Sequence, residues 1–477
     1  METAPHRKGI MEKQMDRSAA SYTSSSSFDT AIADSTIYVN IAHIRALEKL
    51  GVVSKDSAER AVRFLSSLLK TGVKIPEEAE DIHIVVESAL SNHVPEVGEM
   101  LALGKSRNDA VVAAVKIKLR QKLYELGLSL LETIEAFLTR SVAEAVAVFP
   151  VYTHLQRAAP ASFGFVLQSY AVRLLKTYPL LETVLQECKE SPLGSGPVAG
   201  TSVPLDRQYV AGLLGFSRLS LNALEATSSR DFLLRTLALN LAVAVVLSSF
   251  AEELVVYSSE EFGLLRMPEE LSATSSIMPQ KRNPVVAEVM RTKAAEALAG
   301  LTAVAGILAR QPSGYNLDLQ QTTPKIWLAL EQLSSSLEIA RKLVNTVEVD
   351  YRRALDACRP PTAAVELANY LTLVRGISFR RAHNVAGKIS RLIASNNLNP
   401  DTLAEAFEGL GLNMSVDEVM SVMEPVRTLG RYSARGSANP DQVREVSSKL
   451  LEETKKMKQE LVEERDRYDE TLSKLLA

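Results

Sequence analysis

Apolar residues recur every three or four positions along most of this 477-residue chain, the spacing of amphipathic helices. The clearest stretch lies between Pro95 and Pro150, where no proline interrupts the pattern. Its repeating apolar positions are Val111, Val115, Leu119, Leu123, Leu126 and Leu130. Strand-like alternation bounded by turn residues is scarce. The pattern therefore predicts an all-α fold whose long helices need neighbours to cover their apolar faces.

Other segments repeat this helical pattern. Regular helical sequence starts near Ile37, and Gly51 is a plausible stop. Further helices are predicted over 229–263, after Pro284, from Pro324 to about 357, and over 445–475. The last helix is highly charged; we favour a solvated amphipathic face over a partner-binding coil. The first 27 residues end in a Ser-rich stretch and are interpreted as an extended arm.

The length of the chain predicts more than one domain. Composition changes at Cys358-Arg359-Pro360-Pro361, which we interpret as a joint. We therefore expect an N-terminal helical domain with its arm over residues 1–104, a central long-helix bundle over 105–357, and a small C-terminal helical domain over 358–477.

Composition narrows the class of protein. The net charge of −3 argues against a nucleic-acid binder. Thr236–Phe250 is apolar but contains Asn240, so it predicts a buried core helix rather than a membrane span. The first residues contain no apolar signal core, and we expect a cytoplasmic protein.

Cys188 and Cys358 stand alone and are interpreted as buried apolar residues. Without a metal-ligand cluster or a Gly-rich phosphate loop, we expect no metal ion and no cofactor.

The segment Thr274–Pro284 carries the strongest chemical signal. It separates two helical runs and contains two serines, an amide, an asparagine and two cations. Loops carry binding and catalytic groups because a rigid scaffold can aim them. A polar connector is the alternative, but a connector rarely needs that combination. We single out Ser275, Lys281 and Asn283 as candidates.

Two more segments are candidates. Gly104–Asp109 opens a long helix, where free backbone N–H groups and the helix dipole suit a carboxylate. Arg107 adds a bidentate donor, although this stretch could simply cap the helix. Tyr152–Arg157 contains His154 next to Thr153, and a satisfied structural histidine is the alternative there.

These three segments resemble the motifs of the argininosuccinate lyase family, within the fumarase/aspartase superfamily. Ser-Ser-Ile-Met-Pro-Gln-Lys-Arg-Asn-Pro is similar to the signature loop, Thr-His-Leu-Gln to a second motif, and Ser-Arg-Asn-Asp to a substrate-binding stretch. Weaker matches follow in collinear order, from about residue 24 to about 443. They are Asp29, Glu80–His83 with Glu87, Ala199–Arg207, Ser229–Phe232 and Ser313–Gln320.

The resemblance implies an anti elimination that splits argininosuccinate into arginine and fumarate, the last step of arginine biosynthesis. Ser275 would be the base, and Lys281 would favour its ionised form and stabilise the doubly charged intermediate. His154, paired with Glu288, would donate the proton to the leaving group or orient the acid. The substrate-binding residues implied are Asp29, Ser106, Arg107, Asn108, Thr153, Gln156, Arg230, Asn283, Tyr315 and Gln320. The resemblance also implies a homotetramer with a shared helix core, each site being built from three subunits.

Some positions depart from the family pattern. Ala102-Leu103-Gly104-Lys105 replaces His-Thr-Gly-Arg, and Ala110 and Ala159 each stand where the family has Gln. Thr274 replaces a Gly, and Thr323 replaces a substrate-contacting Lys, for which Lys325 is a candidate substitute. Two alternatives therefore stay open: a superfamily lyase acting on adenylosuccinate or aspartate, and a non-catalytic structural homologue like the lens crystallins of this family.

Overall fold

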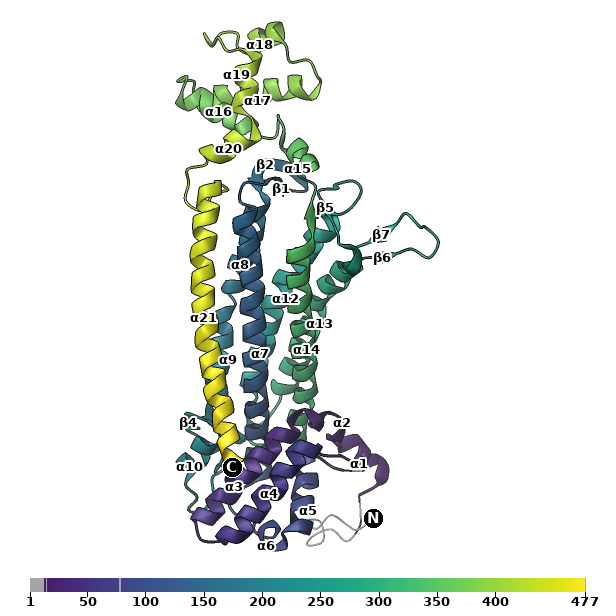
Figure 1. Ribbon diagram of the computed structural model, residues 1–477, viewed down its shortest axis with the longest axis vertical. Helices are drawn as coiled ribbons and strands as arrows, with labels where there is room; N and C mark the ends of the chain where they lie inside the picture. Colours follow the sequence, from purple (N-terminus) through teal and green to yellow (C-terminus); the bar gives the residue numbers. More distant parts are fainter. Residues whose placement is uncertain (1–12, 14, 77–78, 477) are drawn as a thin grey trace.

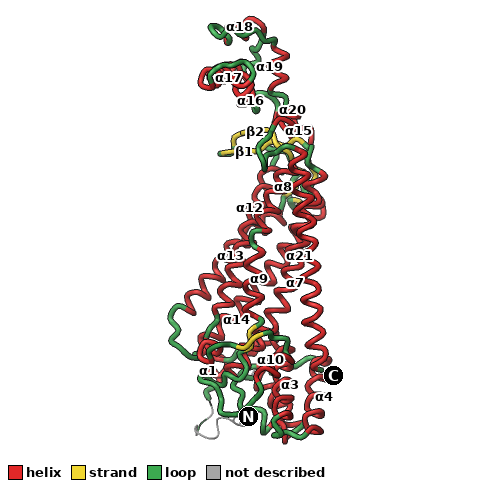
Figure 2. Tube along the Cα trace, turned by 90° about the vertical axis from the view of Figure 1, so that its left-hand side faces the viewer, coloured by secondary structure: helices red, strands yellow, loops and turns green. Residues whose placement is uncertain are grey.

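The computed structural model describes residues 13, 15–76 and 79–476 and is an elongated molecule built around a bundle of long helices (Figures 1 and 2). The bundle helices are α7 (Arg107–Ala143), α8 (Phe163–Leu175), α9 (Tyr178–Cys188), α12 (Asp231–Tyr257), α13 (Val285–Leu308), α14 (Thr323–Thr346) and α21 (Pro440–Leu475). The long helix α7 packs against α8, α14 and α21, while α12 packs against α13 and α14. The predicted all-α fold is confirmed.

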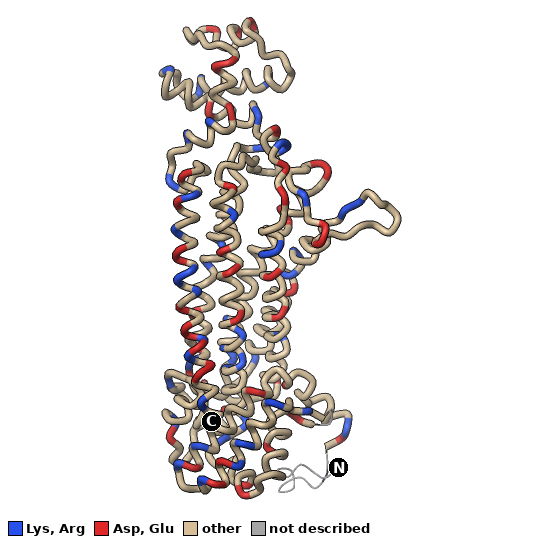
Figure 3. Tube along the Cα trace, viewed as in Figure 1, with Lys and Arg blue, Asp and Glu red and all other residues tan. Residues whose placement is uncertain are grey.

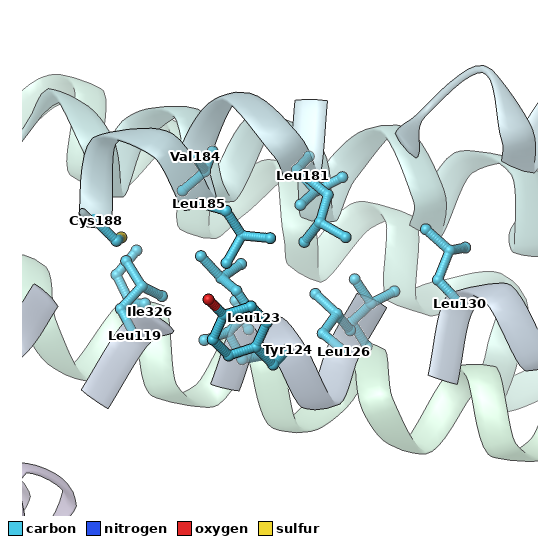
Figure 4. Close-up of a cluster of buried hydrophobic side chains, with 14 of the residues drawn as sticks. Leu119, Leu123, Tyr124, Leu126, Leu130, Leu181, Val184, Leu185, Cys188 and Ile326 are labelled. Atoms are coloured by element: carbon cyan, nitrogen blue, oxygen red, sulfur yellow. The ribbon is translucent and has the colours of Figure 1, made fainter. Parts of the chain in front are cut away.

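The core of the bundle is made by the apolar positions that the sequence pattern marks. From Val115 to Leu130, the repeating positions of α7 are buried. Figure 4 shows Leu119, Leu123 and Leu126 facing Leu181 and Leu185 of α9. Cys188 at the end of α9 and Cys358 are both buried free thiols, as expected. The burial of apolar surface between these helices makes the main contribution to the stability of the bundle.

Shorter helices cover the N-terminal end of the bundle. They are α1 (Arg17–Thr23), α2 (Ser26–Asp29), η2 (Thr30–Ile32), α3 (Ala33–Lys49), α4 (Lys55–Thr71), α5 (Ile82–His93) and α6 (Pro95–Gly98). Helix α3 starts near the predicted Ile37 and ends before Gly51, whose φ is 79°. The extended arm is wrong for residues 17–23, because the Asp16 carboxylate accepts hydrogen bonds from the N–H groups of Ser18 and Ala19 and caps a helix there. Residues 1–12 and 14 of that arm lie outside the described residues.

Helix α12 is long and apolar enough, by length and composition, to cross a membrane. It lies inside the bundle instead, in contact with α8, α9, α13 and α14. Leu233, Leu237, Leu247 and Phe250 are buried in the main core. The amide of Asn240 donates a hydrogen bond to the carbonyl of Ala329 on α14 (2.6 Å), so its polarity is satisfied there. The prediction of a buried core helix is confirmed.

Short strand pairs lie between helices toward both ends of the bundle. Within the described residues the strands are β1 (Val148–Thr153), β2 (Gln156–Ser162), β3 (Glu190–Ser191), β4 (Arg218–Leu219), β5 (Leu265–Arg266), β6 (Ala273–Thr274), β7 (Arg282–Asn283) and β8 (Glu348–Val349). The antiparallel pairs are β1–β2, β5–β8 and β6–β7, whereas β3–β4 is parallel. Because β8 pairs with β5, the helix predicted from Pro324 to about 357 is divided into α14 and α15 (Tyr351–Cys358).

A small helical unit lies beyond the strands. It contains α16 (Ala364–Leu373), α17 (Phe379–Ala394), α18 (Pro400–Ala406), α19 (Val416–Val422) and α20 (Pro425–Arg431). Its buried residues form a cluster separate from the bundle core. The chain then returns along α7 as α21, with Leu461, Tyr468 and Leu472 in the main core and charged residues along its outer side (Figure 3). The last helix is thus amphipathic as expected, but it belongs to the bundle and not to the small unit.

Four short helices complete the connections. They are α10 (Arg207–Leu213), α11 (Ala223–Ser228), η3 (Glu269–Leu271) and η4 (Leu317–Thr322). Helix α10 packs against α3, and η4 packs against α13 and α14. Helices α10 and η4 help to bring loops from the middle of the chain to the N-terminal end of the bundle, where most of the predicted binding residues lie.

Candidate active site

The start of α7 is held in place by its own side chains. Ser106 is the N-cap: its hydroxyl accepts from the N–H of Asn108 (3.3 Å), and its own N–H donates to the Asp109 carboxylate (2.9 Å). The Arg107 guanidinium forms an ion pair with Asp81 (2.9 Å), the N-cap of α5. The Asn108 amide donates to the carbonyl of Pro197 (2.9 Å). The capping role of this stretch is confirmed, and its binding role stays a prediction.

Asp109 links this helix start to a glycine-rich loop. Its carboxylate accepts hydrogen bonds from the N–H groups of Gly194 (3.2 Å) and Gly196 (2.9 Å). Burial raises the pKa of Asp109 to about 6, although these hydrogen bonds act in the opposite direction. Sequence reasoning did not single out Asp109 or Asp81. The signal available in the sequence was that each is an acidic residue at a position where helices are capped.

Asp29 is a second buried carboxylate at this end. It accepts from the Ser25 hydroxyl (2.6 Å) and from the N–H of Ile82 (3.1 Å). Burial raises its pKa to about 6, with the Ser25 and Ile82 hydrogen bonds opposing that shift. The nearby Arg107 also lowers the pKa of Asp29, with a smaller effect than burial.

Three residues from distant loops join them. The Arg230 guanidinium is buried and donates to the carbonyls of Ser229 (3.0 Å) and Thr227 (3.3 Å), and burial lowers its pKa to about 10. Burial raises the pKa of Tyr315, and its next largest influence is the nearby Arg230. Gln320 in η4 donates through its amide to the carbonyl of Thr23 (3.1 Å). We call these gathered residues the N-terminal cluster: Asp29, Asp81, Ser106, Arg107, Asn108, Arg230, Tyr315 and Gln320.

His154 lies elsewhere, at the tip of the β1–β2 hairpin. His154 and Leu155 are the two turn residues, with φ of 55° and 56°, and both flanking residues Thr153 and Gln156 are exposed. A tight hairpin turn needs left-handed backbone at both positions, which costs a residue such as leucine about 1–2 kcal/mol. The motif thus lies on paired strands and not on a helix. Backbone strain of this kind is concentrated at functional sites.

The signature loop projects from the side of the bundle between β6 and β7 (Figure 1). The Ser275 hydroxyl accepts hydrogen bonds from the N–H groups of Met278 (3.1 Å) and Ile277 (3.3 Å). Donors aimed at this oxygen favour its ionised form, which is what a serine base requires. Lys281 is exposed and, among the described residues, makes no ion pair. Asn283 lies in β7, and Glu288 lies in the first turn of α13.

The predicted residues therefore fall into separate places within one chain. The N-terminal cluster lies at one end of the bundle, the hairpin at the other, and the signature loop on the side (Figure 1). Within the described part of the chain, no hydrogen bond or ion pair joins His154 to Glu288, or Ser275 to the cluster. The described residues also contain no group of three or more His, Cys, Asp or Glu side chains that could hold a metal ion.

The comparisons with known proteins agree along the length of the chain. Residues 9–299 match the family model described as Lyase, and residues 361–429 match the argininosuccinate lyase C-terminal model. The argininosuccinate lyase of Methanothermobacter thermautotrophicus is 33% identical over 450 residues, covering 92% of this chain and 96% of that protein. That of Methanothrix thermoacetophila is 32% identical over 464 residues, covering 95% and 94%. The chain belongs to the argininosuccinate lyase family. It is a carbon–nitrogen lyase.

Solved structures agree on the fold of this lyase. EDDS lyase in complex with formate has a TM-score of 0.85 at 21% identity, covering 98% of this chain and 96% of that one. A class II fumarase from Schistosoma mansoni has a TM-score of 0.69 at 16% identity, covering 85% and 97%. At these identities the likeness shows the fold alone.

One departure from the family pattern can be explained by its surroundings. Lys105, where an arginine is usual, has its side chain 4% exposed and donates to Glu87 (3.0 Å) and Asn40 (2.5 Å). Burial raises the pKa of Glu87, but Lys105 outweighs that effect and the pKa is lowered. Burial lowers the pKa of the neighbouring His83 to about 4, so its imidazole is neutral at pH 7. Lys105 is thus the buried member of the pair, and the partly exposed Glu87 supplies the carboxylate that its charge requires.

Proposed function

We propose that this lyase cleaves argininosuccinate into arginine and fumarate by anti elimination. The observation that carries the proposal is the N-terminal cluster, in which residues from five separate segments surround Arg107 and Tyr315. Two guanidinium groups and a helix N-terminus suit a substrate that carries several carboxylates. The cluster also holds carboxylates, Asp29 and Asp81, that suit the cationic end of the same molecule.

The chemical steps are assigned to the signature loop and the hairpin. Ser275 removes the proton next to a substrate carboxylate, and the two backbone N–H groups at its hydroxyl make it a stronger candidate than Ser276. Lys281 stabilises the intermediate, in which that carboxylate carries two negative charges. Asn283 binds a substrate carboxylate together with Thr153 and Gln156. His154, paired with Glu288, donates the proton to the departing nitrogen or orients the group that does.

The working site is proposed to combine three subunits of a homotetramer. Within one chain the hairpin, the loop and the cluster are separated, so a neighbouring copy has to supply the missing parts. The faces of α12 and α13 leave apolar side chains exposed, among them Val245 (44%), Val289 (58%) and Leu298 (52%). Long helices with an uncovered apolar stripe suit a shared helix core. Light scattering of the purified chain tests this: a tetramer supports the model, and an active monomer contradicts it.

The substrate is tested by fumarate formation, followed by its ultraviolet absorbance. The pure protein is mixed in parallel with argininosuccinate, adenylosuccinate and aspartate. We expect fumarate from argininosuccinate alone, with no added metal or cofactor, as for a cytoplasmic biosynthetic enzyme. Fumarate from another substrate alone would keep the mechanism and replace the substrate. If none of the three substrates gave fumarate, a structural homologue without activity would be favoured.

A further inference from the structure

A large cavity lies beneath the hairpin, and among its lining residues only Gln156 has a role in the steps above. Its volume is about 870 Å³, within the range of small-molecule sites. Four segments form its wall: the β1–β2 hairpin, the stretch after α12, helix α15 and the joint that leads to the small helical unit. A ligand held there would touch the hairpin and the joint at the same time.

Three guanidinium groups converge on this wall: Arg157 from the hairpin, Arg353 from α15 and Arg359 from the joint. The wall also contains two carboxylates, Glu261 and Asp356. Asp356 forms an ion pair with Arg359 (3.1 Å). Within the described residues, neither Arg157 nor Arg353 forms an ion pair, so two cations are left for an incoming ligand. Tyr152 and Phe262 supply apolar surface next to them.

The position of Arg353 depends on a glycine. Its guanidinium crosses the backbone of Gly263, where an added Cβ would lie 1.4 Å from Nη1. The φ of Gly263 is 56°, which also favours glycine. The chain therefore leaves room at residue 263 for this one side chain, which holds the Arg353 charge at the cavity wall.

We propose that this cavity binds a small dianion, either a dicarboxylate or a phosphate, between Arg157 and Arg353. Two separated guanidinium groups without carboxylate partners match two acidic groups of one ligand, or the oxygens of one phosphate. Because Tyr152, Leu155 and Gln156 line the same cavity, a bound dianion restrains the hairpin that carries His154. Fumarate, the product of the proposed function, is one such ligand, and the cavity would then respond to product.

Calorimetric titration of the full-length protein tests the proposal at constant ionic strength, with fumarate and inorganic phosphate in separate arms. We expect at least one of these ligands to bind at a site that Arg353→Gln weakens by roughly 10-fold to 100-fold, the usual effect of losing a hydrogen bond to a charged group. Gly263→Ala should weaken the same site without removing a charge. Arg352→Gln, on the same helix but away from the cavity, is the matched control and should bind like wild type.

The titrations with fumarate and with phosphate distinguish a dicarboxylate site from a phosphate site. Binding of phosphate alone at this site assigns a phosphate ligand, and binding of fumarate alone a dicarboxylate. Fumarate also has the proposed active site, so its second binding event is the one that must respond to Arg353→Gln and not to Lys281→Met. Affinities unchanged in both Arg353→Gln and Gly263→Ala, or lowered equally in Arg352→Gln, would overturn the proposal. Binding is measured without turnover, so loss of the proposed function would leave this result readable.

Discussion

The N-terminal cluster and the signature loop differ in how firmly the chain holds them. In the cluster, Arg107 is paired with Asp81, Arg230 is buried with two carbonyl partners, and Asp29 accepts two hydrogen bonds. In the loop, Ile277 is 86% exposed, and the base is closed by the two-residue strands β6 and β7 and by an ion pair of Arg282 with Glu269. The proposed binding groups thus have fixed partners within the chain, whereas the proposed base lies on an exposed loop, the kind of element that can close over a substrate.

This contrast follows from what each part has to do. A carboxylate is recognised by donors at fixed positions, and fixing them in advance lowers the entropy lost on binding. A base must admit substrate and then exclude water, which a buried and fully bonded group could not do. The hairpin is intermediate: its strands pair over their length, but His154 and Leu155 at the tip are exposed and in left-handed backbone.

The largest expected effect tests the loop. Ser275→Ala should lower kcat by about 10²- to 10⁴-fold, the range for a positioned acid or base. The melting temperature should stay close to wild type, because the Ser275 hydroxyl bonds only to N–H groups of its own loop. Ser276→Ala is the matched control and should keep most activity. A Ser275→Ala enzyme with near-normal turnover would remove Ser275 from the mechanism.

A mixing experiment tests whether the cluster and the loop meet between chains. Arg107→Met and Ser275→Ala are each expected to be inactive, since each lacks one half of the site. Co-assembled from both variants, the protein should regain activity, because some sites then take an intact cluster from one chain and an intact loop from another. Ser275→Ala mixed with Lys281→Met is the control. Both substitutions lie on the same loop, so every site contains an altered loop and no activity should return. Equal recovery in both mixtures, or none in either, would contradict the shared site.

The buried acid of the cluster predicts a pH effect. Its pKa is raised from 3.8 to about 6, so the stability that Asp29 contributes is present below about pH 4 and is lost as the pH rises through 6. Asp29→Asn cannot ionise, and we expect it to be more stable than wild type at pH 7.5 by up to roughly 3 kcal/mol, with no difference at pH 4. Thermal unfolding at both pH values measures this. The exposed Asp318→Asn should show no such pH dependence, and a parallel shift in both variants would argue against burial as the cause.

The smallest effect concerns the hairpin tip. Leu155→Gly should raise stability by about 1 kcal/mol, because glycine adopts a φ of 56° without the Cβ clash. Leu155 is 67% exposed, so little apolar burial is lost. Leu155→Val should have the opposite sign, since a β-branched residue fits left-handed backbone worse. Melting temperatures of the three proteins decide the point, and equal values would show that the turn stores no strain.

The pattern of apolar positions was enough to predict the long helices. Val115, Leu119, Leu123 and Leu130 of α7 are buried as their spacing indicates, and α12 is a core helix in spite of its apolar length. Helix periodicity is a local property with a strong signal over many turns. Most of the strand pairs were missed because their strands have only two residues, and β5–β8 also joins distant partners, Leu265 with Val349. The turn at His154-Leu155 lacks the Asn or Gly that usually marks a hairpin.

The candidate residues were found by their resemblance to a family, and their roles stay predictions. Their local chemistry could be read in part from the sequence: Ser106 caps α7, and Ser275 precedes a tight loop. The contacts of these residues with distant parts of the chain could not be predicted from the sequence. Asp81 lies 26 positions before Arg107, and Gln320 contacts Thr23 across nearly 300 residues. The use of Gly263 to make room for Arg353 has no sequence signal beyond the glycine itself.

By itself, the sequence determined which long segments are helical, which of their faces are buried and which short motifs are candidates for chemistry, because these depend on neighbours within a few turns. Only the tertiary structure decided that the candidate binding residues gather at one end of the bundle while His154 and Ser275 lie elsewhere. It also decided that α21 returns to α7, and that three arginines line one cavity. Those outcomes depend on the packing of helices distant in sequence, where a small change of crossing angle moves a side chain by many ångströms and leaves the local pattern unchanged.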